Sequence, residues 1–322
     1  MKLVQGVRDL VDDYDVFLLD MWGVMHDGSR PYDGVLDVIQ KLRAAGKRLV
    51  ILSNSSKRQD NSIKMLRKLG FDPNDFEQII TSGEVAFALL GGKSALETSP
   101  EPWSKLAEVA NQKAVVMGSG DGDTEYLQAC GWQVSSAEES SLVVARGTFT
   151  VNDGSTVVHK REDEAAYDEA LANTLDVCAS RRLPMLVTNP DKIRPDAERP
   201  PMPGKIGDTY EAALARHGVE NPSSLVKRIG KPFSDVYEMS LKSDMDKSRA
   251  CMVGDALETD VTGGTLAGIT TVWVLMDGIH SPDAQSLDGA DKVIDAFNQK
   301  SKETYASGQT LQPDYLMAHF RW

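Results

Sequence analysis

Several polar side chains in this chain directly follow short apolar runs. They are Asp20, Ser53, Asn54 and Asp255, joined by Lys231 after a glycine turn and by Asp260 five residues beyond Asp255. Short unbroken apolar runs are typical of buried strands in a parallel sheet. If the strands share one sheet, their polar ends meet at its carboxyl edge, where open α/β sheets bind ligands. On the run at 16–19 alone, it is equally plausible that Asp20 only caps a turn.

Together, these side chains suit the transfer of a phosphoryl group. A carboxylate can attack phosphorus and form an aspartyl-phosphate. A hydroxyl and backbone N–H groups can hold the equatorial oxygens, and a lysine can neutralise their charge. Several carboxylates at one edge repel one another, so they need a cation, and an all-oxygen site suits Mg²⁺. The residues therefore predict a magnesium-dependent site for a small anionic substrate.

The elements that position these groups alternate between strand and helix. Apolar runs near 16–19, 49–52 and 78–80 are separated by helical patterns at 34–45 and 61–69, which predicts a doubly wound parallel α/β sheet. A second alternation follows a linker-like stretch at 91–102, and strand-edge chemistry returns after about residue 225. We expect a discontinuous core domain, 1–92 with 225–322, and an inserted α/β domain, 93–224.

The length and net charge of the chain limit its number of domains and the classes of partner that it can bind. The chain has 322 residues, 41% of them hydrophobic and 26% charged, with a formal net charge of −13. This length favours two domains. The charge disfavours nucleic acid and anionic membranes as main partners, because both would be repelled. It places no such restriction on a small anionic substrate, which responds to the local field.

The cysteines indicate a reducing compartment, and the hydropathy pattern shows no candidate membrane span. The three cysteines lack metal-ligand spacing, and their odd number gives no disulfide framework. No apolar run approaches the ~20 residues that span a bilayer. We therefore expect a cytoplasmic protein. Phe320 and Trp322, close to the end of the sequence, fit either a tail packed on the body or a contact in a homodimer.

Four stretches carry a resemblance to a known family. They are Asp20-Met-Trp-Gly-Val24, Leu49-Val-Ile-Leu-Ser-Asn54, Gly230-Lys-Pro232 and Met252-Val-Gly-Asp-Ala-Leu-Glu-Thr-Asp260. In this order and spacing they resemble the four motifs of the haloacid dehalogenase (HAD) superfamily. The long insertion, with Thr188-Asn-Pro-Asp191 and Pro203-Gly204, is similar to the large α/β cap of class IIA members. The resemblance covers most of the chain.

The resemblance implies a role for each matching residue. Asp20 would be the nucleophile and a Mg²⁺ ligand, with Asp255 and the backbone carbonyl of Trp22 as further ligands. Asp260 would orient metal-bound water or Lys231. Ser53 and Asn54 would hold the phosphoryl group, and Lys231 would balance its charge.

Two residues of the insertion are candidates for substrate contact. Asp191 and Lys192 follow Thr188-Asn-Pro at a strand end, where class IIA caps present substrate-contacting residues. The alternative for Asp191 is a capped turn, because Asn-Pro-Asp is strong turn chemistry by itself.

The sequence departs from the family pattern at Trp22. Phosphatases of this superfamily usually carry a second aspartate two positions after the nucleophile, and it protonates the leaving alkoxide. Indole cannot donate that proton. Three explanations remain open: substrates with good leaving groups, a substitute acid such as His26 or Asp27, or a protein that binds a phosphorylated ligand as a sensor. Dehalogenation or phosphonate cleavage is a weaker alternative, because dehalogenases use no Mg²⁺ and would leave Asp255 and Asp260 without a task.

Overall fold

The computed structural model describes residues 1–92, 103, 112–120, 122–194, 200–304 and 310–322. The chain forms two compact units. The first consists of 1–53, 59–81 and 231–322, and the second of 54–58 and 82–230. The domain boundaries expected at 92/93 and 224/225 stay a prediction, and most of the expected linker, 93–102, lies outside the described residues.

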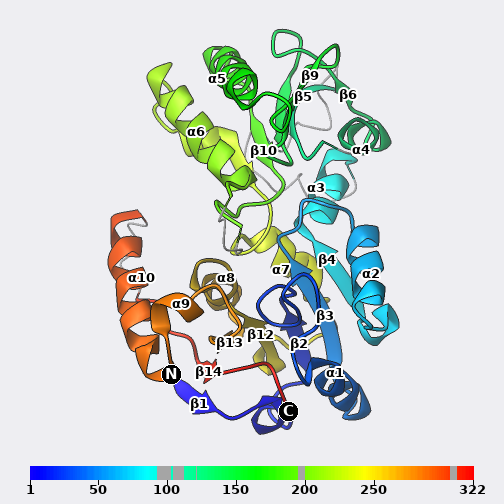
Figure 1. The fold of residues 1–322 in the computed structure, drawn as a ribbon, viewed down its shortest axis with the longest axis vertical. Coiled ribbons are helices and arrows are strands. Elements are labelled where there is room, and N and C mark those ends of the chain that lie inside the picture. Colours follow the sequence, from blue (N-terminus) through cyan, green and yellow to red (C-terminus); the bar gives the residue numbers. More distant parts are fainter. Residues whose placement is uncertain (93–102, 104–111, 121, 195–199, 305–309) are drawn as a thin grey trace. The chain divides into compact units, whose positions relative to one another are not determined.

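The first unit is built on a seven-stranded sheet in which every pair of neighbours is parallel (Figure 1). In sheet order its strands are β1 (Lys2–Val4), β14 (Tyr315–Met317), β13 (Thr270–Val274), β12 (Ala250–Gly254), β2 (Val16–Leu19), β3 (Arg48–Ser53) and β4 (Gln78–Thr81). Because all seven run the same way, the groups that follow β2, β3 and β12 lie at one edge.

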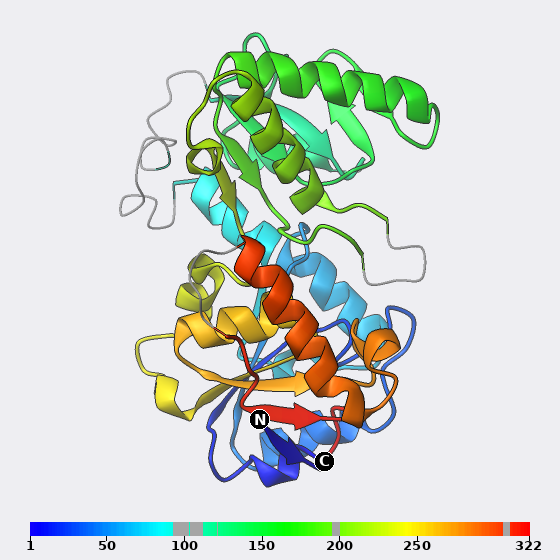
Figure 2. The same cartoon turned by 90° about the vertical axis from the view of Figure 1, so that its left-hand side faces the viewer.

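Helices cover both faces of this sheet. On one face, α1 (Val35–Ala44) and α2 (Gln59–Lys68) bury apolar side chains against alternate strand residues such as Phe17 and Ile51. On the other face, α10 (Ala290–Thr304) packs Val293 and Ile294 near Trp273, and Figure 2 shows this helix lying across the sheet. Strands with apolar groups on both faces explain the unbroken apolar runs of the sequence.

Shorter helices complete the first unit. They are α7 (Ser234–Ser240), the π-helical turn η7 (Leu257–Val261), α8 (Thr262–Ala267) and α9 (Ser281–Ala284), with 3-10 turns at Val7–Asp9, Pro73–Asp75, Lys247–Arg249 and Leu287–Gly289. The turn η7 begins three residues after β12 ends and carries Asp260, and α8 continues directly from it.

The second unit has its own mixed sheet. Its strand order is β11 (Val226–Arg228), β10 (Met185–Val187), β7 (Leu142–Ala145), β5 (Lys113–Gly118), β8 (Thr150–Asn152) and β9 (Val157–His159), with β6 (Gln133–Val134) also paired to β5. The β5–β8 and β8–β9 pairs are antiparallel. Its helices are α3 (Ser82–Leu90), α4 (Asp123–Ala129), α5 (Glu164–Ser180) and α6 (Pro203–Arg216), with a 3-10 turn at Pro222–Leu225. Side chains of α5 and α6 form one apolar core with this sheet.

The architecture confirms the α/β fold expected from the sequence: a parallel core sheet and a separate, inserted α/β unit. The strand before Lys231 is β11, which belongs to the sheet of the second unit and not to the core sheet. No helix among the described residues is long and apolar enough to cross a bilayer.

Candidate functional site

Three carboxylates and one lysine meet at the carboxyl edge of the core sheet. Asp20 follows β2 and Asp255 follows β12, and these two strands pair through Leu19 and Val253. Asp260 reaches the same place from η7. The carboxylates of the three acids offer ligand atoms that all lie within 4.8 Å of one another. The sheet register therefore brings together acids that are about 240 positions apart in the sequence.

Lys231 bridges two of these acids. Its Nζ lies 2.6 Å from Asp20 Oδ1 and 2.7 Å from Asp260 Oδ1. The lysine is 2% exposed and Asp260 is 1% exposed, so water screens these ion pairs poorly. Asp260 is held further by the backbone N–H of Ala256, which donates to its Oδ2 at 3.1 Å. The lysine is thus fixed directly beside the proposed nucleophile.

The charges of this cluster do not balance. Three acids face one lysine, and among the described contacts the carboxylate of Asp255 accepts only a backbone N–H. Burial raises the pKa of Asp255 well above its ordinary value, and repulsion from Asp20 and Asp260 adds to the rise. Burial likewise raises the pKa of Asp20, against the attraction of Lys231. For Lys231, burial lowers the pKa, but the two acids outweigh it and the net pKa is raised.

This excess of buried negative charge fits a divalent cation. The donors are carboxylate oxygens, which are the ligands that hard cations prefer. A cation would lower the cost of keeping Asp20 and Asp255 ionised together. Asp20, Asp255 and Asp260 are the residues of the described chain that could hold it. The site therefore has the composition expected for a divalent metal.

Trp22 occupies the position where the family pattern places an acid. Its indole packs against Gly28, where an added Cβ would lie 2.3 Å from Cζ3 of the ring, and it meets the His26 ring edge to face at 6.0 Å. The loop that carries it is pinned by bridges from His26 to Trp22 and to Pro31. Trp22 is therefore a packing residue of this loop.

His26 and Asp27, the two substitute acids considered from the sequence, both have local structural contacts. His26 is 2% exposed, and its Nδ1 accepts from the N–H of Gly28 at 2.9 Å. Burial lowers the pKa of His26, so the ring is neutral at pH 7. Asp27 caps a turn by accepting from Ser29 and Arg30, and these hydrogen bonds lower its pKa. Neither group carries a proton that it could donate readily.

The remaining predicted residues are Ser53, Asn54, Asp191 and Lys192. Ser53 is the last residue of β3, at the same edge as Asp20. In the second unit, the side-chain amide of Asn54 donates to Asp191 Oδ1 at 2.8 Å. Lys192 forms an ion pair of 2.8 Å with Asp208 and is 59% exposed. The contact of Asn54 with Asp191 was not foreseen, because 137 positions separate the two residues.

The structure adds two groups that the sequence did not single out. The N–H of Ile279 donates to Asp255 Oδ2 at 2.8 Å, and the indole N–H of Trp273 donates to the Asp255 carbonyl at 2.8 Å. Both come from β13 and the loop after it. Every residue except proline has a backbone N–H, so the sequence could not indicate that Ile279 contacts Asp255, and this contact is seen only in the structure.

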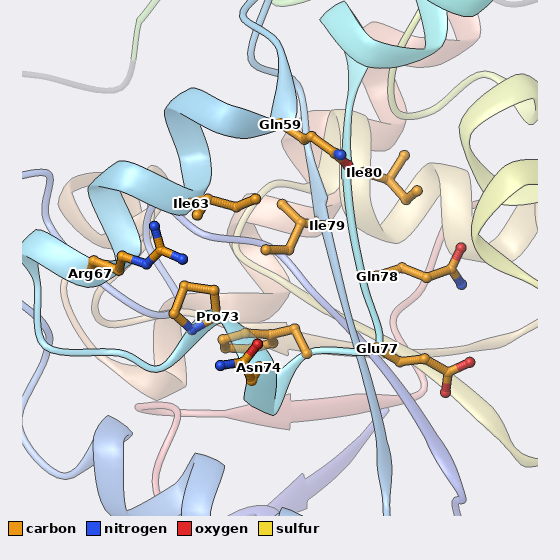
Figure 3. Close-up of a pocket in the computed structure, with 10 residues that line it drawn as sticks. Gln59, Ile63, Arg67, Pro73, Asn74, Glu77, Gln78, Ile79 and Ile80 are labelled. Carbon is orange, nitrogen blue, oxygen red and sulfur yellow. The ribbon is translucent and has the colours of Figure 1, made fainter.

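A separate cavity of about 370 Å³ lies in the first unit between α2 and the edge strand β4. Figure 3 shows Ile63 and Ile79 lining it from these two elements, with Arg67 and Glu77 at its rim. Its polar lining has no acid cluster and no nucleophile beside a base. The chemistry therefore belongs to the acidic cluster at the carboxyl edge rather than to this cavity.

Two family models match the chain. Residues 17–133 match a model described as haloacid dehalogenase-like hydrolase, and residues 228–299 match one described as HAD-hydrolase-like. The first match begins in β2 and includes Asp20, and the second includes Lys231, Asp255 and Asp260. The matched segments thus contain all four members of the charged cluster.

Individual relatives match over most of their length. Chronophin of Homo sapiens is 27% identical over 290 residues, which are 87% of this chain and 88% of that protein. Phosphoglycolate phosphatase 2 of Arabidopsis thaliana is 27% identical over 89% of this chain and 90% of its own length. The crystal structure of a 4-nitrophenylphosphatase from Thermotoga maritima superimposes with a TM-score of 0.65 at 24% identity, covering 96% of both chains.

Proposed function

The chain belongs to class IIA of the HAD superfamily, and on that premise we propose that it is a metal-dependent phosphatase acting on a small phosphorylated metabolite through an aspartyl-phosphate at Asp20. The observation that carries the proposal is the position of Lys231, which lies 2.6 Å from Asp20 inside a cluster of three acids. An acid that serves only as a turn cap has no need of this arrangement.

The reaction has two steps on the side chain of Asp20. First, a carboxylate oxygen attacks phosphorus, and the bond from phosphorus to the leaving oxygen breaks with its electrons on that oxygen. Second, water attacks phosphorus, and the bond from phosphorus to Asp20 breaks, which restores the carboxylate and releases phosphate. Lys231 holds Asp20 in place and offsets negative charge that builds up on the phosphoryl oxygens. Ser53 and Asn54 are the proposed donors to those oxygens.

The proposed ligands of the cation are Asp20, Asp255 and the backbone carbonyl of Trp22, with Asp260 orienting the cluster. When bound, a Mg²⁺ ion would supply positive charge that lets an anionic phosphate approach an anionic nucleophile. Asp191 and Lys192 are proposed substrate contacts on the second unit. The hydrogen bond from Asn54 to Asp191 gives Asp191 a further role in holding Asn54.

Trp22 sets a limit on the substrate. The leaving oxygen takes up a proton most easily from a positioned acid, and such an acid contributes about 10²–10⁴-fold to rate. Trp22 supplies none, and His26 and Asp27 are tied into the loop. We therefore propose aryl or acyl phosphates, whose leaving groups are stable without a proton, as better substrates than alkyl phosphates.

A screen for phosphate release tests the proposal. Aryl, acyl and sugar phosphates are offered with and without Mg²⁺, to the wild type and to Asp20→Asn. We expect metal-dependent release that the asparagine variant abolishes, because an amide is a poor nucleophile. Asp13→Asn, an exposed acid of the same unit, is the matched control and should keep wild-type activity. Release that continues in the presence of a chelator would contradict the metal assignment.

The alternative is a protein that binds a phosphorylated ligand without efficient turnover. Trp22 at the acid position is the observation that favours it. Calorimetry with the phosphates of the screen distinguishes the two functions: tight binding without release by the wild type supports the sensor. Dehalogenation and phosphonate cleavage remain weaker alternatives, and they predict product from haloacids or phosphonates in the same assay.

A further inference from the structure

Asp255 depends on one loop for its orientation. The loop, residues 275–280, follows β13, and its Ile279 N–H is the donor to Asp255 Oδ2. Gly278 lies so close that an added Cβ would be 2.5 Å from Asp255 Cβ. Asp255 Oδ2 thus accepts a hydrogen bond from this loop, and the same side chain packs against Gly278. The position of this loop therefore determines how the carboxylate is presented.

The loop itself is tied down from two directions. The N–H of Leu275 donates to Met317 O at 3.0 Å, and that of Met276 donates to Ala318 O at 2.9 Å. These bonds extend the pairing of β13 with β14 into the segment that follows β14. From the other side, the hydroxyl of Tyr32 donates to Asp277 O at 3.1 Å.

A histidine close to the end of the sequence completes these ties. Nδ1 of His319 lies 2.9 Å from both carboxylate oxygens of Asp277. An ionised carboxylate only accepts hydrogen bonds, so Nδ1 carries the hydrogen. The Asp277 side chain is 15% exposed and that of His319 is 44% exposed, so this pair is partly shielded from water. The contact holds the loop one residue before Gly278, the residue packed on Asp255.

We propose that His319 is a positioning residue for the metal site: through Asp277 it holds the loop that orients Asp255. Tyr32 acts on the same loop through the Asp277 carbonyl. The inference rests on the metal site of the proposed function and goes beyond it, because it assigns a role in cation affinity to the segment after β14. Outer contacts that orient ligands typically affect metal affinity by 10–100-fold.

The test measures Mg²⁺ affinity without using activity. Thermal unfolding of the full chain is followed at increasing Mg²⁺, and the concentration that gives half of the maximal rise in Tm is read for each protein. His319→Leu removes the donor to Asp277, and His319→Gln returns an N–H donor. His217→Leu is the matched control, because His217 makes a similar 2.9 Å contact with Asp176 in the second unit.

We expect His319→Leu to need about 10-fold more Mg²⁺ than the wild type, His319→Gln to need less than the leucine variant, and the control to be unchanged. Tyr32→Phe should shift the titration in the same direction, and it keeps the inference testable if the leucine variant fails to fold. At saturating Mg²⁺, kcat of the folded variants should return to within about twofold of wild type, because the affected step is metal binding.

Two results overturn this inference. One is a Mg²⁺ titration of the folded His319 and Tyr32 variants that coincides with the wild type. The other is a loss of kcat that saturating Mg²⁺ does not restore. A wild type that shows no Mg²⁺-dependent rise in Tm would instead refute the metal site of the proposed function, so the two failures are told apart by the wild-type curve alone.

Discussion

At the scale of the residue, Asp20, Asp255, Asp260 and Lys231 form the charged cluster of the proposed site, and position 22 carries an indole instead of a carboxyl group. Asp20 and Lys231 form an ion pair of 2.6 Å, which holds the carboxylate of the proposed nucleophile. Two positions along, Trp22 packs on Gly28 and on His26. An acid at position 20 is therefore followed by a packing side chain at position 22, where the resemblance to the family leads us to expect a second acid.

Replacing Trp22 by an acid tests whether the proton donor is what limits the enzyme. We expect Trp22→Asp to raise kcat/KM for alkyl phosphates by up to about 10²-fold, the lower end of what a positioned acid contributes, and to change kcat/KM for aryl phosphates less. Trp22→Asn is the matched control, because asparagine has nearly the shape of aspartate but no acidic proton. Phosphate release from glycerol phosphate and from 4-nitrophenyl phosphate gives the ratio of kcat/KM for an alkyl and an aryl substrate. An equal ratio in the two variants would show that the introduced acid does not protonate the leaving group.

At the scale of the element, the long periodic segments were predictable and the short strands were not. The helix expected at 34–45 is α1 (Val35–Ala44), and the apolar run at 49–52 lies inside the six-residue strand β3 (Arg48–Ser53). By contrast, β1 and β14 have three residues each, too few for a period-two pattern to emerge. They exist because they pair with each other and β14 pairs with β13, which no local pattern encodes.

The segment after β14 supports a stability prediction. Phe320 is 1% exposed and belongs to the core that α1 and α2 form with the sheet, so this tail docks on its own unit. We expect Phe320→Ala to lower the free energy of unfolding by about 3–5 kcal/mol, because it opens a cavity in a packed core. Phe149→Ala, at a phenylalanine that is 49% exposed, is the control and should cost far less. Urea unfolding followed by circular dichroism measures both.

An equal effect of the two substitutions would contradict the docking of the tail. The homodimer contact that Phe320 and Trp322 suggested from the sequence stays a prediction. Sedimentation of the wild type and of Trp322→Ala would address it, since a dimer that depends on this side chain should dissociate in the variant.

At the scale of the whole molecule, the acids of the site could be predicted from the sequence because they follow strands, and the strands are visible as apolar runs. Asp20 and Asp255 were found in this way, and the register of β2 with β12 brings them together. The residues that hold these acids in position could not be predicted from the sequence. His319 meets Asp277 across 42 positions, and Ile279 acts through its backbone, so neither residue type nor spacing marks the contact.

The buried charge of Asp255 leads to a prediction about the entire fold. In the absence of metal, burial and two neighbouring acids make this carboxylate costly to keep ionised. Asp255→Asn removes the charge and retains an oxygen that can accept from Ile279, so we expect the metal-free variant to be more stable than the wild type by about 1–3 kcal/mol. With Mg²⁺ at 1,000 times its Kd, the wild type gains about 4.1 kcal/mol and the variant gains little, so the order is reversed. Urea unfolding measures the free energy of unfolding of the wild type and of the variant, each with a chelator and with Mg²⁺. Asp288→Asn, at an exposed acid, should follow the wild type in both conditions.

An Asp255→Asn variant that is less stable than the wild type in the presence of the chelator would contradict this prediction. It would mean that Asp255 stabilises the fold without a cation, and the unbalanced charge would then no longer indicate a metal.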